Sequence, residues 1–280
     1  MSPAELAWLK TAGVAMLAVL GVVGGWRCSR WRGRWWLLGY AVPLAIVVSI
    51  SLSRLFPALE LRPPCRWIMA GRTEFALLAL VYTLMLTTLV YRLRRRSEKV
   101  LLSILMVACV ISQSILAFLL PAFNYRQLTE LKTIVDGDGV CIQSNNYTCG
   151  PAAAVTALRR IGVHATEGEL AVLAHATQTT GTQPDVLCHA MQERYGVPCR
   201  QVCFDHVSEL RPHVPVVAVI KFALLTDHFV TVLDVTDTLV VVGDPLTGRV
   251  EMTHEQFAKR WRRCGIVLDP PPGHLSDQTQ

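Results

Sequence analysis

Four long apolar stretches lie in the first 123 residues and limit what that part of the chain can fold into. They cover approximately residues 9–26, 35–52, 75–91 and 100–123. A helix needs about 20 apolar residues to cross a bilayer. The one charge inside these stretches is Lys10, which lies near an end. A buried helical core is the alternative, but four such stretches in succession would leave it almost no polar face. We therefore predict a four-helix transmembrane region over residues 1–123.

The basic residues accompany the apolar stretches. Residues 1–132 contain 16 Lys and Arg against 5 Asp and Glu, whereas residues 133–280 contain 11 against 16. This distribution is typical of membrane loops and gives no support for a nucleic-acid partner. The loops 27–34 and 92–99 are dense in arginine, while the middle loop has only the dispersed Arg54, Arg62, Arg66 and Arg72. The positive-inside rule then predicts a multi-pass integral membrane protein whose C-terminal half lies on the extracytoplasmic side.

The rest of the chain has the composition of a folded domain. A polar linker is expected over 124–139, a domain over 140–270 and a polar tail over 271–280. Within the domain, patterns typical of helices come first and valine-rich segments typical of antiparallel strands follow. The strands are expected at 215–222, 229–235, 238–243, 249–252 and 265–268, with a helix at 254–262. This order predicts an α+β fold.

Cys149 is the first candidate for chemistry. Pro151 stands where a helix is expected to begin, so Cys149 would lie at the N-terminal end of that helix. Unpaired N–H groups and the helix dipole stabilise a thiolate at such a position. An ordinary buried cysteine is the alternative interpretation.

A nucleophilic thiol needs a base, and the base needs an orienting group. His228 begins one expected strand and Asp244 ends the next, so a hairpin with its turn near Asp237 would bring them to the same end of the sheet. His228 taken alone would be better explained as a core histidine. Asp227 is a weaker orienter because it would point to the opposite face of the strand. Gln143, six residues before Cys149, has a side-chain amide suited to stabilising an oxyanion.

These residues form a recognisable series of motifs. Residues 140–268 resemble the bacteriocin-leader (double-glycine) peptidase family of papain-like cysteine peptidases. The resemblance rests on Gln143-x5-Cys149-Gly150-Pro151-Ala152, Gly181-Thr182-x-Pro184, His228-Phe229-Val230 and Gly243-Asp244-Pro245 followed by Gly248. It implies a papain-like fold with Cys149 as nucleophile, His228 as base, Asp244 as orienter and Gln143 as oxyanion donor. It also implies a peptide or protein substrate, without a cofactor or metal.

The domain order differs from that of the transporter members of this family. In those proteins the peptidase precedes the spans and an ATPase follows them. Here the apolar stretches come first, and no phosphate-binding loop of the Gly-x4-Gly-Lys-Ser/Thr type occurs. A transporter partner would therefore be a separate chain. We expect a membrane-anchored cysteine peptidase; the alternatives are a catalytically idle peptide-binding module serving a transporter, and transfer chemistry on the same thiol.

The other cysteines of the domain leave several interpretations open. A zinc site could be drawn from Cys199, Cys203, His206 and the pair Cys188-His189, but the spacing is unusual for zinc. Structural thiols are more typical, or disulfides if the domain lies outside the cytoplasm. The redox state of Cys188, Cys199, Cys203 and Cys264 is not determined by the pattern.

Overall fold

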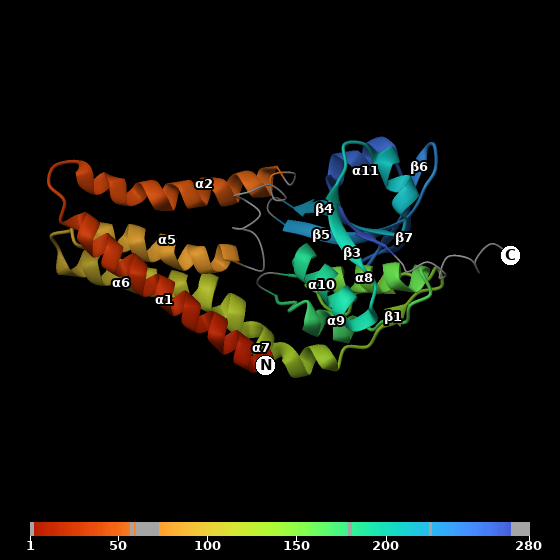
Figure 1. Cartoon of the computed structure of the whole chain (residues 1–280), viewed down its shortest axis with the longest axis horizontal. Coiled ribbons are helices and arrows are strands. Elements are labelled where there is room, and N and C mark those ends of the chain that lie inside the picture. The colour runs from red at the N-terminus through yellow and green to blue at the C-terminus, as the bar shows by residue number, and fades with distance from the viewer. Residues whose placement is uncertain (1–2, 57–58, 60–72, 179–180, 224–225, 270–280) are drawn as a thin grey trace. The chain divides into compact units, whose positions relative to one another are not determined.

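A computed structural model of the chain describes residues 3–269 apart from 57–58, 60–72, 179–180 and 224–225. The chain divides into two compact units, Met1–Phe123 and Asn124–Gln280 (Figure 1). The middle-loop arginines at 62, 66 and 72 and the tail expected at 271–280 lie outside the described residues.

The first unit is helical. Its elements are α1 (Pro3–Ser29), a 3-10 turn η1 (Trp35–Tyr40), α2 (Ala41–Leu55), α5 (Thr73–Val90), α6 (Arg96–Val110), a π-helical turn η3 (Ile111–Ile115) and the start of α7 (Leu116–Thr129). Among the described residues, two segments are long and apolar enough to cross a membrane, Thr11–Ser29 and Trp35–Ser53, and Phe75–Val90 is apolar but shorter. The fourth predicted span, 100–123, runs through α6, η3 and the start of α7, which follow one another without a gap.

Helices α1 and α5 pack closely through glycine. A Cβ on Gly25 would lie 2.8 Å from the carbonyl oxygen of Leu84, so the backbones approach where α1 has no side chain. Gly21, one turn earlier, faces Thr83 in the same way. The Thr83 hydroxyl donates to the carbonyl of Ala79 at 2.7 Å, within its own helix. Small residues four apart are typical of interfaces between membrane helices.

The second unit is a six-stranded antiparallel sheet with helices on both faces. The strand order is β3-β8-β4-β5-β6-β7. The strands are β3 (Cys199–Cys203), β4 (Val216–Ala223), β5 (Thr226–Val235), β6 (Leu239–Asp244), β7 (Gly248–Thr253) and β8 (Trp261–Leu268). The helices are α8 (Cys149–Arg160), α9 (Glu167–Leu173), α10 (Pro184–Tyr195) and α11 (His254–Arg260), with an unpredicted 3-10 helix η4 (Val207–His213). The α+β prediction for this part of the chain is confirmed.

Alternate residues of the strands pack into two apolar cores, one on each face of the sheet. Val217 faces the core that contains α8, α9 and α10, whereas its neighbour Val216 packs with Phe257 of α11 and with Trp261. Successive strand residues point to opposite faces, so each face of the sheet is covered by its own helices. Figure 1 shows α8, α9 and α10 on one side of the sheet and α11 on the other.

The segment 124–139, expected to be a polar linker, belongs to the folded second unit. Leu128 near the end of α7 is buried against Ala171 and Ala176, so this part of the segment contributes to the core of the second unit. Strand β1 (Ile134–Val135) pairs with β2 (Cys141–Ile142). Two-residue strands carry too little periodicity to be recognised from sequence.

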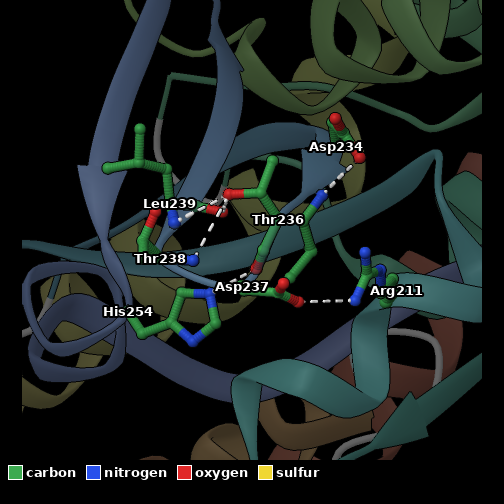
Figure 2. A network of polar contacts seen from close by, with 8 residues as sticks. Arg211, Asp234, Thr236, Asp237, Thr238, Leu239 and His254 are labelled. Carbon is green, nitrogen blue, oxygen red and sulfur yellow. Dashed lines mark hydrogen bonds and ion pairs between the residues drawn. The ribbon is translucent and has the colours of Figure 1, made fainter.

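The hairpin of β5 and β6 is closed by a dense polar turn (Figure 2). The Thr236 hydroxyl accepts hydrogen bonds from the N–H groups of Leu239 (2.9 Å) and Thr238 (3.4 Å). Asp237 of the turn also forms an ion pair at 2.9 Å with Arg211 of η4. A bulge follows between Val232 and Asp234, and the register then pairs Thr231 with Gly243. The turn thereby sets which residues of β5 and β6 meet at the opposite end of the hairpin.

Candidate active site

His228 and Asp244 lie together at that end of the hairpin. The His228 Nε2 and Asp244 Oδ1 atoms are 2.7 Å apart, and the residues are only 4% and 7% exposed. Asp244 Oδ1 also accepts a hydrogen bond from the N–H of Leu246 at 2.9 Å. The structure thus brings together the two residues that the sequence places on neighbouring strands.

The electrostatics of the pair favour its charged form. Burial lowers the pKa of His228, but hydrogen bonds to Asp244 and Cys149 and their charges outweigh it and raise the pKa to about 9. Burial raises the pKa of Asp244, but the hydrogen bonds from His228 and Leu246 lower it further than burial raises it. An imidazolium and a carboxylate are therefore favoured at neutral pH. Because Nε2 faces the carboxylate, Nδ1 is the nitrogen left to serve Cys149.

Cys149 is half-buried at the first residue of α8. A Cβ on Gly150 would lie 3.0 Å from Thr182 Cβ and 3.4 Å from a ring carbon of Phe229, the neighbour of His228. Glycine at this position therefore lets the start of α8 lie close to β5. Thr231 fastens the same two elements, because its hydroxyl donates to the carbonyl of Ala153 at 2.7 Å.

Gln143 is bound at both its backbone and its side chain. Its N–H donates to the carbonyl of Pro245, directly after Asp244, at 2.9 Å. Its Nε2 donates to the carbonyl of Asn145 at 2.8 Å, and that carbonyl also accepts from the Thr148 hydroxyl at 3.0 Å. The amide thus lies against the turn that leads into Cys149. Its Oε1 is buried and has no hydrogen-bond partner in the part of the chain that the structure describes.

The remaining cysteines of the domain do not compete with Cys149. Disulfides join Cys188 to Cys199 and Cys203 to Cys264. Cys141 is free but buried, and burial raises its pKa to about 12. Over the described part of residues 140–268, Cys149 is therefore the one free thiol with access to solvent.

The other candidates considered from sequence have different partners. Asp227 forms an ion pair with Arg262 at 2.7 Å, on β8, and so is engaged away from Asp244. The cysteines of the possible zinc site are in disulfides, and no group of three metal-ligating side chains occurs among the described residues.

Two neighbours of the site were not assigned from sequence. The Phe222 ring lies 5.6 Å from the His228 ring and is largely exposed. Thr182 is buried beside Gly150, and its hydroxyl has no hydrogen-bond partner among the described residues. The Gly181-Thr182-x-Pro184 motif could have indicated from sequence that Thr182 lies near the site, whereas no motif around Phe222 indicates this.

A cysteine at the start of a helix, packed on an antiparallel sheet that carries a histidine and an aspartate on neighbouring strands, defines a papain-like fold. Residues 139–273 match the model of the Peptidase C39 family. The chain belongs to this family of cysteine peptidases.

Two archaeal relatives match the same half of the chain. An uncharacterised protein of Methanothermobacter marburgensis is 32% identical over 143 residues, which are 51% of this chain and 96% of that protein. A second, from Methanothermobacter thermautotrophicus, is 28% identical over 141 residues, or 50% of this chain and 95% of that protein.

Similar solved structures include two peptidase domains of transporters. One is the peptidase domain of Streptococcus ComA, a bifunctional ABC transporter of a quorum-sensing pathway. It is 20% identical, with a TM-score of 0.42, and the match covers 46% of this chain and 96% of that one. The other is a double glycine motif protease from an AMS/PCAT transporter in complex with the leader peptide, with 18% identity, a TM-score of 0.42, and coverage of 50% and 93%.

The charge of Asp244 has a consequence for pH dependence. If protonated His228 is the active form, kcat/KM for peptide hydrolysis falls as pH rises through about 9. Asp244→Asn removes the negative charge that raises the pKa of His228. The fall of kcat/KM on the alkaline side of the pH profile, the alkaline limb, is therefore expected to move to lower pH by roughly 1–3 units. Measured pH profiles of the two proteins check this, and an unmoved limb would assign the titration to another group.

Proposed function

We propose that the chain is a membrane-anchored cysteine peptidase that hydrolyses peptide bonds. Cys149 is the nucleophile, His228 the base and acid, Asp244 its orienter and Gln143 the oxyanion donor. The observation that carries this proposal is the buried 2.7 Å His228–Asp244 pair, in which Asp244 and Cys149 together raise the pKa of His228. Membership of the Peptidase C39 family supports the same reaction class.

The proposed reaction has two stages. The Cys149 thiolate attacks the substrate carbonyl, and the new oxyanion is stabilised by the Gln143 amide and by an N–H at the start of α8, where helical N–H groups have no partner within the helix. His228 then donates its proton to the leaving amine as the C–N bond breaks, which leaves a thioester. In the second stage His228 takes a proton from water, the hydroxide attacks the thioester, and the C–S bond breaks to release the carboxylic acid and the Cys149 thiolate.

The proposed substrate class is a leader peptide that ends in two glycines, which rests on the family and on the motifs around Cys149 and Asp244. Incubating the full-length chain in detergent with such a leader peptide is expected to release the leader after the second glycine. A peptide with two leucines in place of the glycines is the control and is expected to stay intact. Tight binding without cleavage would instead indicate an idle binding module, and a ligated or deamidated product would indicate transfer chemistry.

We also propose that all four apolar segments of residues 1–123 lie in a membrane. Two of them have the length and composition to span, and α1 packs on α5 through Gly21 and Gly25. Many large apolar side chains of the unit are exposed, which water disfavours and lipid does not. They include Trp8, Leu9, Met16, Leu20, Leu44, Val48, Leu101, Ile104 and Val107.

The disulfides support an extracytoplasmic peptidase domain, because such bonds persist in oxidising compartments. This agrees with the side predicted by the arginine-dense loops 27–34 and 92–99.

Both disulfides are expected to be present in cells. Alkylation of intact cells with a maleimide polymer should modify Cys188, Cys199, Cys203 and Cys264 only after reduction. Their loops of 11 and 61 residues imply that loss of the first costs about 3 kcal/mol and loss of the second about 4 kcal/mol of unfolding free energy. Thermal unfolding of Cys188→Ala and Cys203→Ala checks that loss of the second disulfide lowers the unfolding free energy more than loss of the first. Cysteines that stay unmodified in intact cells after reduction but react once the cells are lysed would place the domain in the cytoplasm.

A further inference from the structure

We propose that Glu167 is a positioning residue that holds the oxyanion donor Gln143 in place through Ser144. This inference rests on the proposed peptidase function and deepens it. Glu167 is the first residue of α9, outside every motif discussed above, and its side chain is fully buried. Carboxylates are almost never fully buried unless they are paired, because removing the charge from water is costly.

Both oxygens of the Glu167 carboxylate bind a single residue. Oε1 accepts a hydrogen bond from the N–H of Ser144 at 2.8 Å, and Oε2 accepts one from the Ser144 hydroxyl at 2.7 Å. Ser144 is the residue that directly follows Gln143. The carboxylate therefore holds the backbone at the point from which the Gln143 side chain leaves it.

The backbone of Glu167 is itself fixed. Its N–H donates to the Thr133 hydroxyl at 2.8 Å, and the Ser144 hydroxyl also lies 2.9 Å from the carbonyl of Lys132. The start of α9 thus joins the segment before β1 to the loop after β2. On the other side, the Gln143 N–H is bound to the carbonyl of Pro245. The loop that carries the amide is held from two directions.

This arrangement matters because an oxyanion donor works only when it is placed in advance. Such a donor must lie about 2.7–3.1 Å from the position that the oxyanion will take, and a displacement of about 1 Å can cost about 100-fold in rate. Without the carboxylate, the Ser144 N–H would lose its partner and the loop would relax. Glu167 itself need not touch the substrate for this effect.

Two reactions of Cys149 separate positioning from general damage. A peptide aldehyde ending in two glycines adds to the thiolate: the S–C bond forms, the carbonyl oxygen becomes an oxyanion and His228 supplies its proton. Iodoacetamide alkylates the same sulfur by displacing iodide and forms no oxyanion. Loss of the oxyanion donor therefore weakens the aldehyde complex and hydrolysis but leaves alkylation unchanged.

The experiment compares Glu167→Ala, Gln143→Ala and the double variant in the full-length chain. Gln143→Ala is expected to lower kcat by about 10²–10³-fold, and Glu167→Ala by about 10–100-fold with little change in KM. The double variant is expected to be no slower than Gln143→Ala, because Glu167 acts through that amide. Glu167→Gln, which keeps one oxygen acceptor for the Ser144 N–H, should recover most of the loss.

Glu169→Ala is the matched control. Glu169 lies on the same helix but is turned to the hydroxyl of Tyr195 at 2.8 Å and to Arg194 at 3.0 Å, away from Ser144. It is expected to keep the wild-type kcat. If Glu167→Ala does not fold, Glu167→Asp keeps the charge but shortens its reach, and an intermediate loss of kcat is expected.

Two results would overturn the inference. One is a fall in iodoacetamide alkylation equal to the fall in kcat, and the other is a double variant whose losses multiply. A wild-type chain that neither cleaves peptides nor binds the aldehyde would instead overturn the proposed function, and this inference with it.

Discussion

Cys149→Ala is expected to lower kcat for peptide hydrolysis by about 10⁶-fold, as removal of the nucleophile does in comparable peptidases. The thioester cannot form without the sulfur, and no other accessible thiol is present in the described part of the domain. The chain is expected to remain folded and membrane-bound, because the substitution removes a single half-buried sulfur. Progress curves on a cleaved peptide, together with thermal unfolding, measure both effects.

Cys141→Ala is the matched control for this variant. Cys141 is also a free cysteine of the domain, but it is buried and burial raises its pKa to about 12, so it remains a thiol. Its replacement is expected to leave kcat within a few-fold of wild type. Hydrolysis that survives Cys149→Ala, or disappears in Cys141→Ala, would contradict the assignment of the nucleophile.

His228→Gln is expected to lower kcat by about 10⁴-fold or more and to slow the alkylation of Cys149 at neutral pH. A glutamine amide can still donate to Asp244, but it can neither accept a proton from water nor donate one to a leaving amine. The alkylation rate falls as well, since the cation that stabilises the thiolate is gone. Stopped-flow alkylation and steady-state kinetics measure the two consequences on one preparation.

His228→Ala serves as a comparison that separates catalysis from stability. It leaves the buried Asp244 carboxylate without its main partner, which is expected to cost about 3–5 kcal/mol of unfolding free energy. His228→Gln should therefore be about as inactive but clearly more stable. Equal stability of the two variants would show that the Asp244 carboxylate does not depend on a partner at position 228.

The central residues of the site could be predicted from sequence because each depends on local signals. Valine-rich strands on either side of a turn near Asp237 place His228 and Asp244 at the same end of a hairpin, and the register bears this out. Pro151 marks the beginning of a helix just after Cys149, and α8 begins at Cys149 itself. In both cases the relevant geometry is set within a short length of chain.

What escaped prediction depends on contacts between distant segments. The pairing of Cys203 with Cys264 follows from their direct opposition across β3 and β8, which are adjacent only because the last strand inserts beside β4. From sequence, Glu167 is an ordinary residue at the start of a helix. Its contact with Ser144, which lies 23 residues earlier, is visible only in the folded structure. In the first unit, hydropathy indicates four spans, but it carries no information on the π-helical turn at Ile111–Ile115 that lies within the last of them.

The most direct test of the account is to treat membranes containing the full-length chain with a peptide that carries a thiol-reactive ketone after two glycines, and to map the adduct by mass spectrometry. We expect a single adduct on Cys149, at least about 100-fold slower in His228→Gln because the thiolate is no longer stabilised. Cys141, Cys28 and Cys109 are expected to stay unmodified by the peptide. Equal modification of several cysteines, unchanged in His228→Gln, would contradict an activated thiol at Cys149.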